Sequence, residues 1–238
     1  MLPFLQALTY ADSAYPSGRY TLSHGLEGLV AAGRVRGTDQ VTEVLLDHLR
    51  HTAAPGDGVA TAVAVLEGAL STLITADHEL AATKVTGELR RASTRVGRQL
   101  LSVSGDVDTR LGHEIPSLLA AYRDVVQAKE TPGNQAIAAG LIHASHGLDA
   151  VTAVATELTG LAVGWAGAAL RLRQCDHIGA QVAITAAHPV IAELSEDCVR
   201  TAEHLLDTRQ WRLLGRASPG SDLASAQHET APARLFMS

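Results

Sequence analysis

Residues 38–73 read TDQVTEVLLDHLRHTAAPGDGVATAVAVLEGALSTL, and the spacing of their apolar side chains decides the fold class. Two runs of apolar residues recur at the interval of a single helix face. They are Val41, Val44, Leu45 and Leu49, followed by Val59, Val63, Leu66, Leu70 and Leu73. The Pro55–Gly58 motif between the runs predicts a turn that separates two helices.

Helical patterns recur along the rest of the 238 residues. The apolar side chains are mainly Ala, Leu and Val, with only 3% aromatic residues, which favours helices packed through small side chains. We expect a helix over about 77–103, and three more over 133–188 with breaks near Gly147 and Gly160. Pro189 fits the first turn of the next helix. No segment shows strand-like alternation, so the sequence predicts an all-α, single-domain bundle of roughly eight to ten helices.

The composition changes near the C-terminus. Residues 216–227 are rich in Ser, Ala, Gly, Pro and Asp, which is typical of a flexible linker. Apolar residues return at the end of the chain. We therefore expect a helical domain over 1–215 and a linker with a partner-binding tail over 216–238.

The overall charge and composition exclude several classes of protein. A net charge of −6 and a pI near 6.0 argue against a protein that coats nucleic acid. Two cysteines cannot form a disulfide framework. The first basic residue is Arg19, too late for a signal peptide, and the apolar stretch between Glu157 and Arg171 is too short to suggest a membrane span. These features predict a cytoplasmic protein that binds no membrane.

Known catalytic motifs are missing from the sequence. It contains no G-x-x-x-x-G-K-[ST] phosphate-binding loop, no G-x-S-x-G motif and no H-E-x-x-H motif. No Glu is followed by His three residues later, as a helical di-iron site requires. We therefore expect a protein that is not an enzyme and holds no cofactor or metal.

Three weaker patterns leave alternatives open. His143 and His146, with Cys175, could line the pocket of a helical-bundle enzyme or small-molecule-binding protein, although buried or solvated side chains explain them as well. A basic stripe on one helix face could grip an acidic partner or face solvent; it comprises Arg91, Arg95 and Arg98. A row of glycines indicates close helix packing, in the core or between two copies; it comprises Gly160, Gly164 and Gly167.

Two stretches are more specific, and both resemble the urease accessory protein family UreF. Residues 12–27 read DSAYPSGRYTLSHGLE and contain P-x-G-x-[aromatic]-x-x-S-x-G-L-E, that is Pro16, Gly18, Tyr20, Ser23, Gly25 and Glu27. The chain closes with H-E-x-x-x-x-R-L-F-x-S, formed by His228, Glu229, Arg234, Leu235, Phe236 and Ser238. Arg171 begins a late segment that is similar to the family's arginine-containing one. The family pattern differs at Arg19, where a small residue is usual, and over 173–177, where the family usually has an apolar residue and a proline shortly before Ile/Leu-Gly.

The resemblance implies a function and a set of partner-binding residues. It implies a homodimer that binds the accessory protein UreD, also called UreH. The homodimer and UreD together then recruit the GTPase UreG and help to deliver nickel to apo-urease. By resemblance, Arg171 and the motif residues named above contact partners, with the exception of Ser238.

The residues themselves allow two interpretations of these motifs. Leu235 and Phe236 lie beyond the expected linker, so they could order against a partner or fold back on their own domain. Ser23 could cap a helix through its hydroxyl group, and Glu27 would then lie in the first turn, where the helix dipole favours a negative charge. A partner contact is the alternative for both residues.

Overall fold

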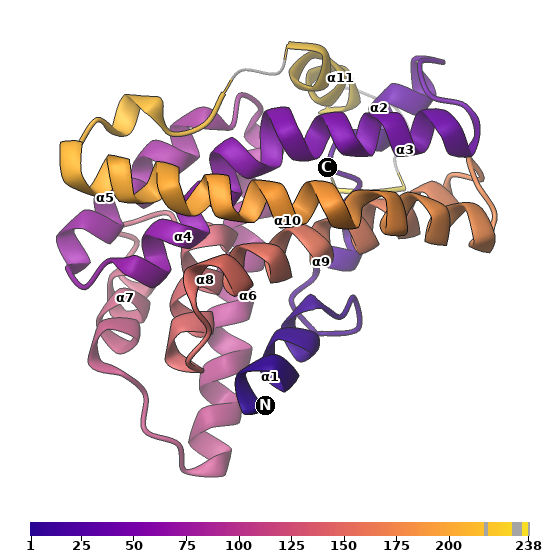
Figure 1. The fold of residues 1–238 in the computed structure, drawn as a ribbon. Helices are drawn as coiled ribbons and strands as arrows, with labels where there is room; N and C mark the ends of the chain where they lie inside the picture. The colour runs from indigo at the N-terminus through magenta and orange to yellow at the C-terminus, as the bar shows by residue number, and fades with distance from the viewer. Residues whose placement is uncertain (217–218, 230–234, 238) are drawn as a thin grey trace.

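The structure is a computed structural model that describes residues 1–216, 219–229 and 235–237. Over these residues the chain is helical with connecting loops and contains no β-strand, which confirms the all-α expectation (Figure 1). The elements are α1 (Leu2–Ala11), η1 (Arg19–Thr21), α2 (Leu26–Ala31), α3 (Gly37–His48), η2 (Leu49–Gly58), α4 (Val59–Leu66), α5 (Leu70–Thr83), α6 (Gly87–Leu111), α7 (Ser117–Gln127), α8 (Gln135–Ser145), α9 (Ala150–Arg171), α10 (His177–Thr208), η3 (Trp211–Leu213) and α11 (Pro219–Glu229).

Two long helices, α9 and α10, organise the core. A short loop joins them into a hairpin, and α10 lies between α9 and α3 (Figure 1). On the other side, α8 packs against both α4 and α6. Trp165 of α9 is fully buried at the centre. By length and composition α9 could also cross a membrane, and 61% of its apolar window is buried inside the protein.

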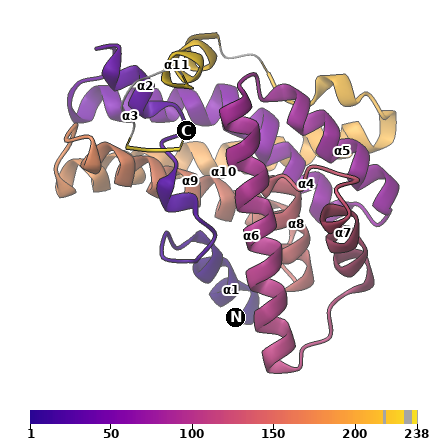
Figure 2. The same ribbon diagram turned by 180° about the vertical axis from the view of Figure 1, so that it is seen from behind.

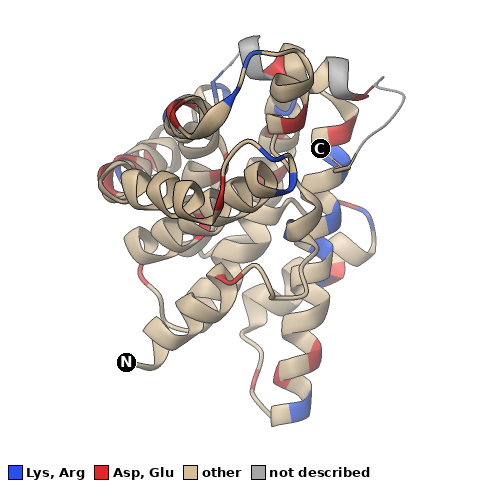
Figure 3. Ribbon diagram, turned by 90° about the vertical axis from the view of Figure 1, so that its right-hand side faces the viewer, with Lys and Arg blue, Asp and Glu red and all other residues tan. Residues whose placement is uncertain are grey.

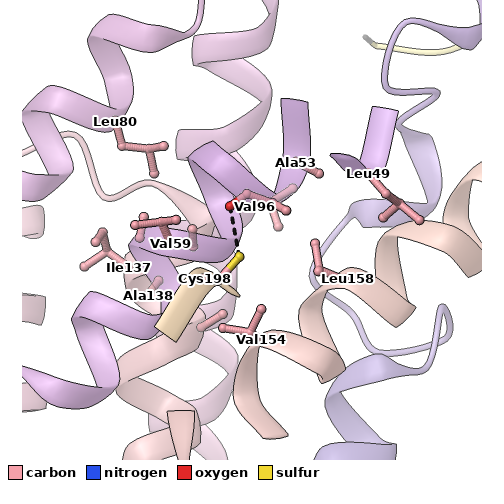
Figure 4. Packing of buried hydrophobic residues seen from close by; sticks show 14 of the residues in the cluster. Leu49, Ala53, Val59, Leu80, Val96, Ile137, Ala138, Val154, Leu158 and Cys198 are labelled. Carbon is pink, nitrogen blue, oxygen red and sulfur yellow. Dashed lines mark hydrogen bonds between the residues drawn. The ribbon is translucent and has the colours of Figure 1, made fainter. Parts of the chain in front are cut away.

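The turn expected at Pro55–Gly58 is wrong, because the chain stays helical from α3 to α4. The intervening η2 is a π-helix with Pro55 inside it. Hydrogen bonds from distant segments stabilise this π-helix. The Cys198 thiol donates a hydrogen bond to the Ala54 carbonyl at 3.2 Å (Figure 4), and the Gly215 amide donates to the Pro55 carbonyl at 2.8 Å.

Three other expected boundaries also differ. The helix expected over 77–103 is two helices, since α5 ends at Thr83 and α6 begins after Thr86, whose hydroxyl accepts the Leu89 amide at 3.2 Å. Gly160 lies inside α9 rather than at a break. Pro189 lies inside α10 rather than in its first turn.

A buried carboxylate fixes the loop before α8. Asp77 of α5 is fully buried and accepts hydrogen bonds from the Tyr122 and Thr131 hydroxyls and from the backbone amides of Gly133 and Asn134, at 2.7–3.0 Å. A buried charge is tolerated only when it is hydrogen-bonded in this way. The network therefore holds α5, α7 and α8 together.

The C-terminal region differs from the linker that its composition predicts. Residues 219–229 form α11, which packs on α2 and α6 (Figure 2). Ala224 and Ser225 are buried there, and the Ser225 hydroxyl lies 3.0 Å from the Thr86 hydroxyl. The C-terminal end of the chain then returns to the body of the protein.

Candidate partner-binding site

The N-terminal motif forms a bent segment between α1 and α2. Gly18 and Gly25 have φ values of 84° and 87°, in the left-handed region that favours glycine, and they precede η1 and α2. Pro16 is exposed and Ser23 is buried. The Ser23 hydroxyl accepts the Glu27 amide at 3.4 Å, although the residue at the N-cap position of α2 is Gly25.

Glu27 connects the N-terminal motif to the C-terminal one. It lies in the first turn of α2, as expected, and is only 8% exposed. Its carboxylate accepts the backbone amides of Leu235 at 2.8 Å and Phe236 at 3.0 Å. The Met237 amide also donates to the Thr21 carbonyl at 2.9 Å. The two motifs, more than 200 residues apart in sequence, therefore meet in one place.

Arg171 completes this terminal cluster, which we define as Tyr20, Glu27, Arg171 and Phe236. The Arg171 guanidinium carbon lies 4.0 Å from the centre of the Tyr20 ring and 4.3 Å from that of Phe236. Its Nη1 donates to the Tyr20 carbonyl at 2.6 Å. Stacking between two aromatic rings suits the planar guanidinium of arginine better than the ammonium of lysine.

The remaining tail residues have different environments. Phe236 is buried at 4% exposure, so this side chain folds back on its own domain. Leu235 is 73% exposed. Glu229 forms an exposed ion pair with Arg91 at 3.0 Å. His228 lies in α11, but its side chain is outside the described part, as is all of Arg234.

The basic stripe on α6 is engaged within the chain. Besides the Arg91 ion pair, Arg95 donates to the Thr21 hydroxyl at 2.8 Å, and Arg98 donates to the Pro132 carbonyl at 3.2 Å. Figure 3 shows several basic positions, in blue, spaced along the long helix that runs to the bottom of the view. Two members of the stripe therefore attach α11 and the N-terminal motif to α6, and the third contacts the loop before α8.

A groove of about 180 Å³ adjoins the terminal cluster. It runs between α9, the start of α10 and the N-terminal segment. Tyr20 and Arg171 line one part of it, and Gly164 and Gly167 line another. A Cβ atom at either glycine would meet nothing within 4 Å, so close packing inside the chain does not explain these two residues.

The two histidines of the alternative pocket hydrogen-bond to other side chains of the protein. His143 is fully buried and hydrogen-bonds to Glu157, while His146 bonds to the Tyr10 hydroxyl at 3.1 Å. A separate cavity of about 110 Å³ is lined in part by His24 and His48, two residues that the sequence pattern did not place together. Burial lowers the pKa of His24 to about 4 and that of His48 to about 3. No group of three potential metal ligands occurs in the described part of the chain.

Comparison with known proteins points to one family. The family model described as UreF matches residues 35–188. Over 235 residues, 98% of this chain and 96% of the relative, the chain is 31% identical to the urease accessory protein UreF of Paenarthrobacter aurescens. It is 28% identical over 238 residues to that of Trichormus variabilis, covering 99% of this chain and 96% of the relative. It is 27% identical over 240 residues to the urease accessory protein UreF 2 of Brucella canis, covering 98% and 91%.

Proposed function

This chain belongs to the UreF family of urease accessory proteins, and we propose on that premise that it is a non-enzymatic adaptor in the nickel-dependent maturation of urease. In this proposal a cytoplasmic homodimer binds UreD/UreH and recruits the GTPase UreG. The resulting complex acts on apo-urease, and nickel is the cargo rather than a resident cofactor.

The observation that carries the proposal is the meeting of the two family motifs in the terminal cluster. Glu27, Arg171 and Phe236 build its interior, whereas Tyr20 and Leu235 remain 57% and 73% exposed. Exposed large apolar groups held by a buried framework are typical of a protein-binding surface. This arrangement supports binding of UreD/UreH by side chains from both ends of the chain.

Co-purification with the cognate UreD/UreH tests the proposal. We expect the wild-type chain to retain UreD/UreH, and the Leu235→Asp variant to retain at least tenfold less while melting within about 2 °C of wild type, because an exposed substitution changes stability little. Leu111→Asp is the matched control, since Leu111 is 63% exposed at the end of α6, outside the terminal cluster. Equal retention by both variants, or no retention by the wild-type chain, would contradict the proposal.

Nickel binding provides a second test. An adaptor should bind no nickel tightly on its own, because the described residues offer no cluster of three ligands. Equilibrium dialysis of the isolated chain measures this. Stoichiometric, tight uptake would identify a nickel carrier instead.

A further inference from the structure

Arg19 is largely buried, although arginine is rarely buried without a partner. Its Nη2 lies 2.8 and 2.6 Å from the two carboxylate oxygens of Glu157 on α9. The two side chains are 11% and 7% exposed. This ion pair attaches the N-terminal motif directly to the central helix.

Glu157 has further partners that keep it ionised. The carboxylate accepts hydrogen bonds from His143 Nε2 at 3.1 Å and from Gln135 Nε2 at 3.2 Å, both on α8. Burial on its own raises the pKa of Glu157, but Arg19 and His143 outweigh it and lower the pKa to about 2. The pair with Arg19 therefore stays charged at neutral pH.

Gly160 provides the space that the Arg19 side chain occupies. A Cβ atom at position 160 would lie 2.9 Å from Arg19 Nη1 and 3.5 Å from the Ala11 carbonyl oxygen. The other two glycines of the row, Gly164 and Gly167, have no such neighbour. Close approach inside the chain therefore accounts for Gly160 alone.

We infer that Arg19, Glu157 and Gly160 form a matched set in which Arg19 is a positioning residue for the partner-binding surface. Arg19 directly precedes Tyr20, and both residues line the groove beside α9. Holding Arg19 in one place restricts where the Tyr20 backbone and side chain can lie. The partner in this inference rests on the proposed function, whereas the positioning is a property of the isolated chain.

The Arg19→Ala variant tests the positioning role. Removing Arg19 leaves the buried Glu157 carboxylate with only His143 and Gln135 as the partners described above, so we expect Tm to fall by about 10 °C. We also expect UreD/UreH affinity to fall at least tenfold at a temperature where the variant is fully folded. Gly97→Ala is the control, since it should destabilise the body of the protein away from the groove and keep wild-type affinity. Wild-type affinity in Arg19→Ala would overturn the positioning role.

A double-mutant cycle tests the matched set without any partner. In the wild-type background we expect Gly164→Ala to raise Tm by a few degrees, because alanine favours a helix, and Gly160→Ala to give no gain because it displaces Arg19. In the Arg19→Ala background, Gly160→Ala should raise Tm as much as Gly164→Ala does. An equal rise in Tm from both substitutions in the wild-type background would refute the matched set. If wild type binds no UreD/UreH, the proposed function fails, but this cycle still decides the inference.

Discussion

At the scale of single residues, Glu27 has one role that the sequence predicted and one that it did not. It lies in the first turn of α2, where the helix dipole favours its charge, and it also accepts two amides from the other end of the chain. The sequence suggested the first role, and the resemblance marked the residue as functional. Neither could predict that its contacts come from Leu235 and Phe236, because those residues lie more than 200 positions away.

Glu27→Gln should weaken attachment of the tail. A neutral amide offers one acceptor oxygen instead of two charged ones, which costs roughly 1.5–3 kcal/mol for hydrogen bonds to a charged group. We expect hydrogen exchange at the Phe236 amide to be at least tenfold faster. Glu43→Gln, on the exposed face of α3, should leave that exchange rate unchanged. Equal rates in wild type and Glu27→Gln would show that the carboxylate does not hold the tail.

His24 and His48 should make stability depend on pH. Their pKa values are about 4 and 3 in the folded protein but near 6.5 in the unfolded chain, so between these values the unfolded chain binds more protons. The contribution of the two histidines to the free energy of unfolding should be fully present above about pH 6.5. It should decline as the pH falls, by on the order of 2 kcal/mol for each histidine at pH 4.5.

Urea unfolding at pH 7.0 and 4.5 measures this decline. His48→Asn should reduce the difference between the two pH values, and the exposed control His204→Asn should not. Protonation of Glu157 should also lower the stability as the pH falls, but only between about pH 4.5 and about pH 2. A flat profile between pH 7.0 and 4.5 would contradict the partly buried, neutral state of the two histidines.

At the scale of helices, apolar spacing predicted the elements but misplaced several boundaries. The periodic run that starts at Val41 does form α3, with its last member Leu49 at the start of η2, and the Gly147 break does precede α9. The proline and glycine signals failed where tertiary contacts compensate for them. In η2, for example, Cys198 and Gly215 supply hydrogen bonds from parts of the chain that a local pattern cannot include.

Gly97 of α6 marks a contact between elements that helix propensity alone would miss. A Cβ atom there would lie 2.2 Å from the Gly133 carbonyl oxygen, so Gly97→Ala should cost about 1–3 kcal/mol despite alanine's higher helix propensity. The control is Gly105→Ala on the same helix, where the three atoms nearest to the added Cβ belong to the guanidinium end of the Arg123 side chain rather than to the backbone. Thermal unfolding should show a lower Tm for Gly97→Ala alone, and a rise in both variants would contradict the close approach.

At the scale of the whole molecule, the N-terminal motif and residues 235–237 meet beside α9 and α6 rather than extending away from the helical body. Arg171 of α9 stacks on Tyr20 and Phe236, and Arg95 of α6 bonds to Thr21. The motifs located most of this site in the sequence. Its geometry depends on which distant helices meet, and one sequence without the fold does not reveal that.

Deleting residues 228–238 should therefore affect both stability and binding. The deletion removes Phe236, whose burial contributes roughly 1.5–3 kcal/mol, so Tm should fall by about 5 °C while the helical circular dichroism spectrum persists. Co-purification with UreD/UreH should be lost. Phe236→Ala, which keeps the exposed Leu235, should reproduce most of the thermal loss and only part of the binding loss. An unchanged Tm in both variants would mean that Phe236 is not packed against the body in solution.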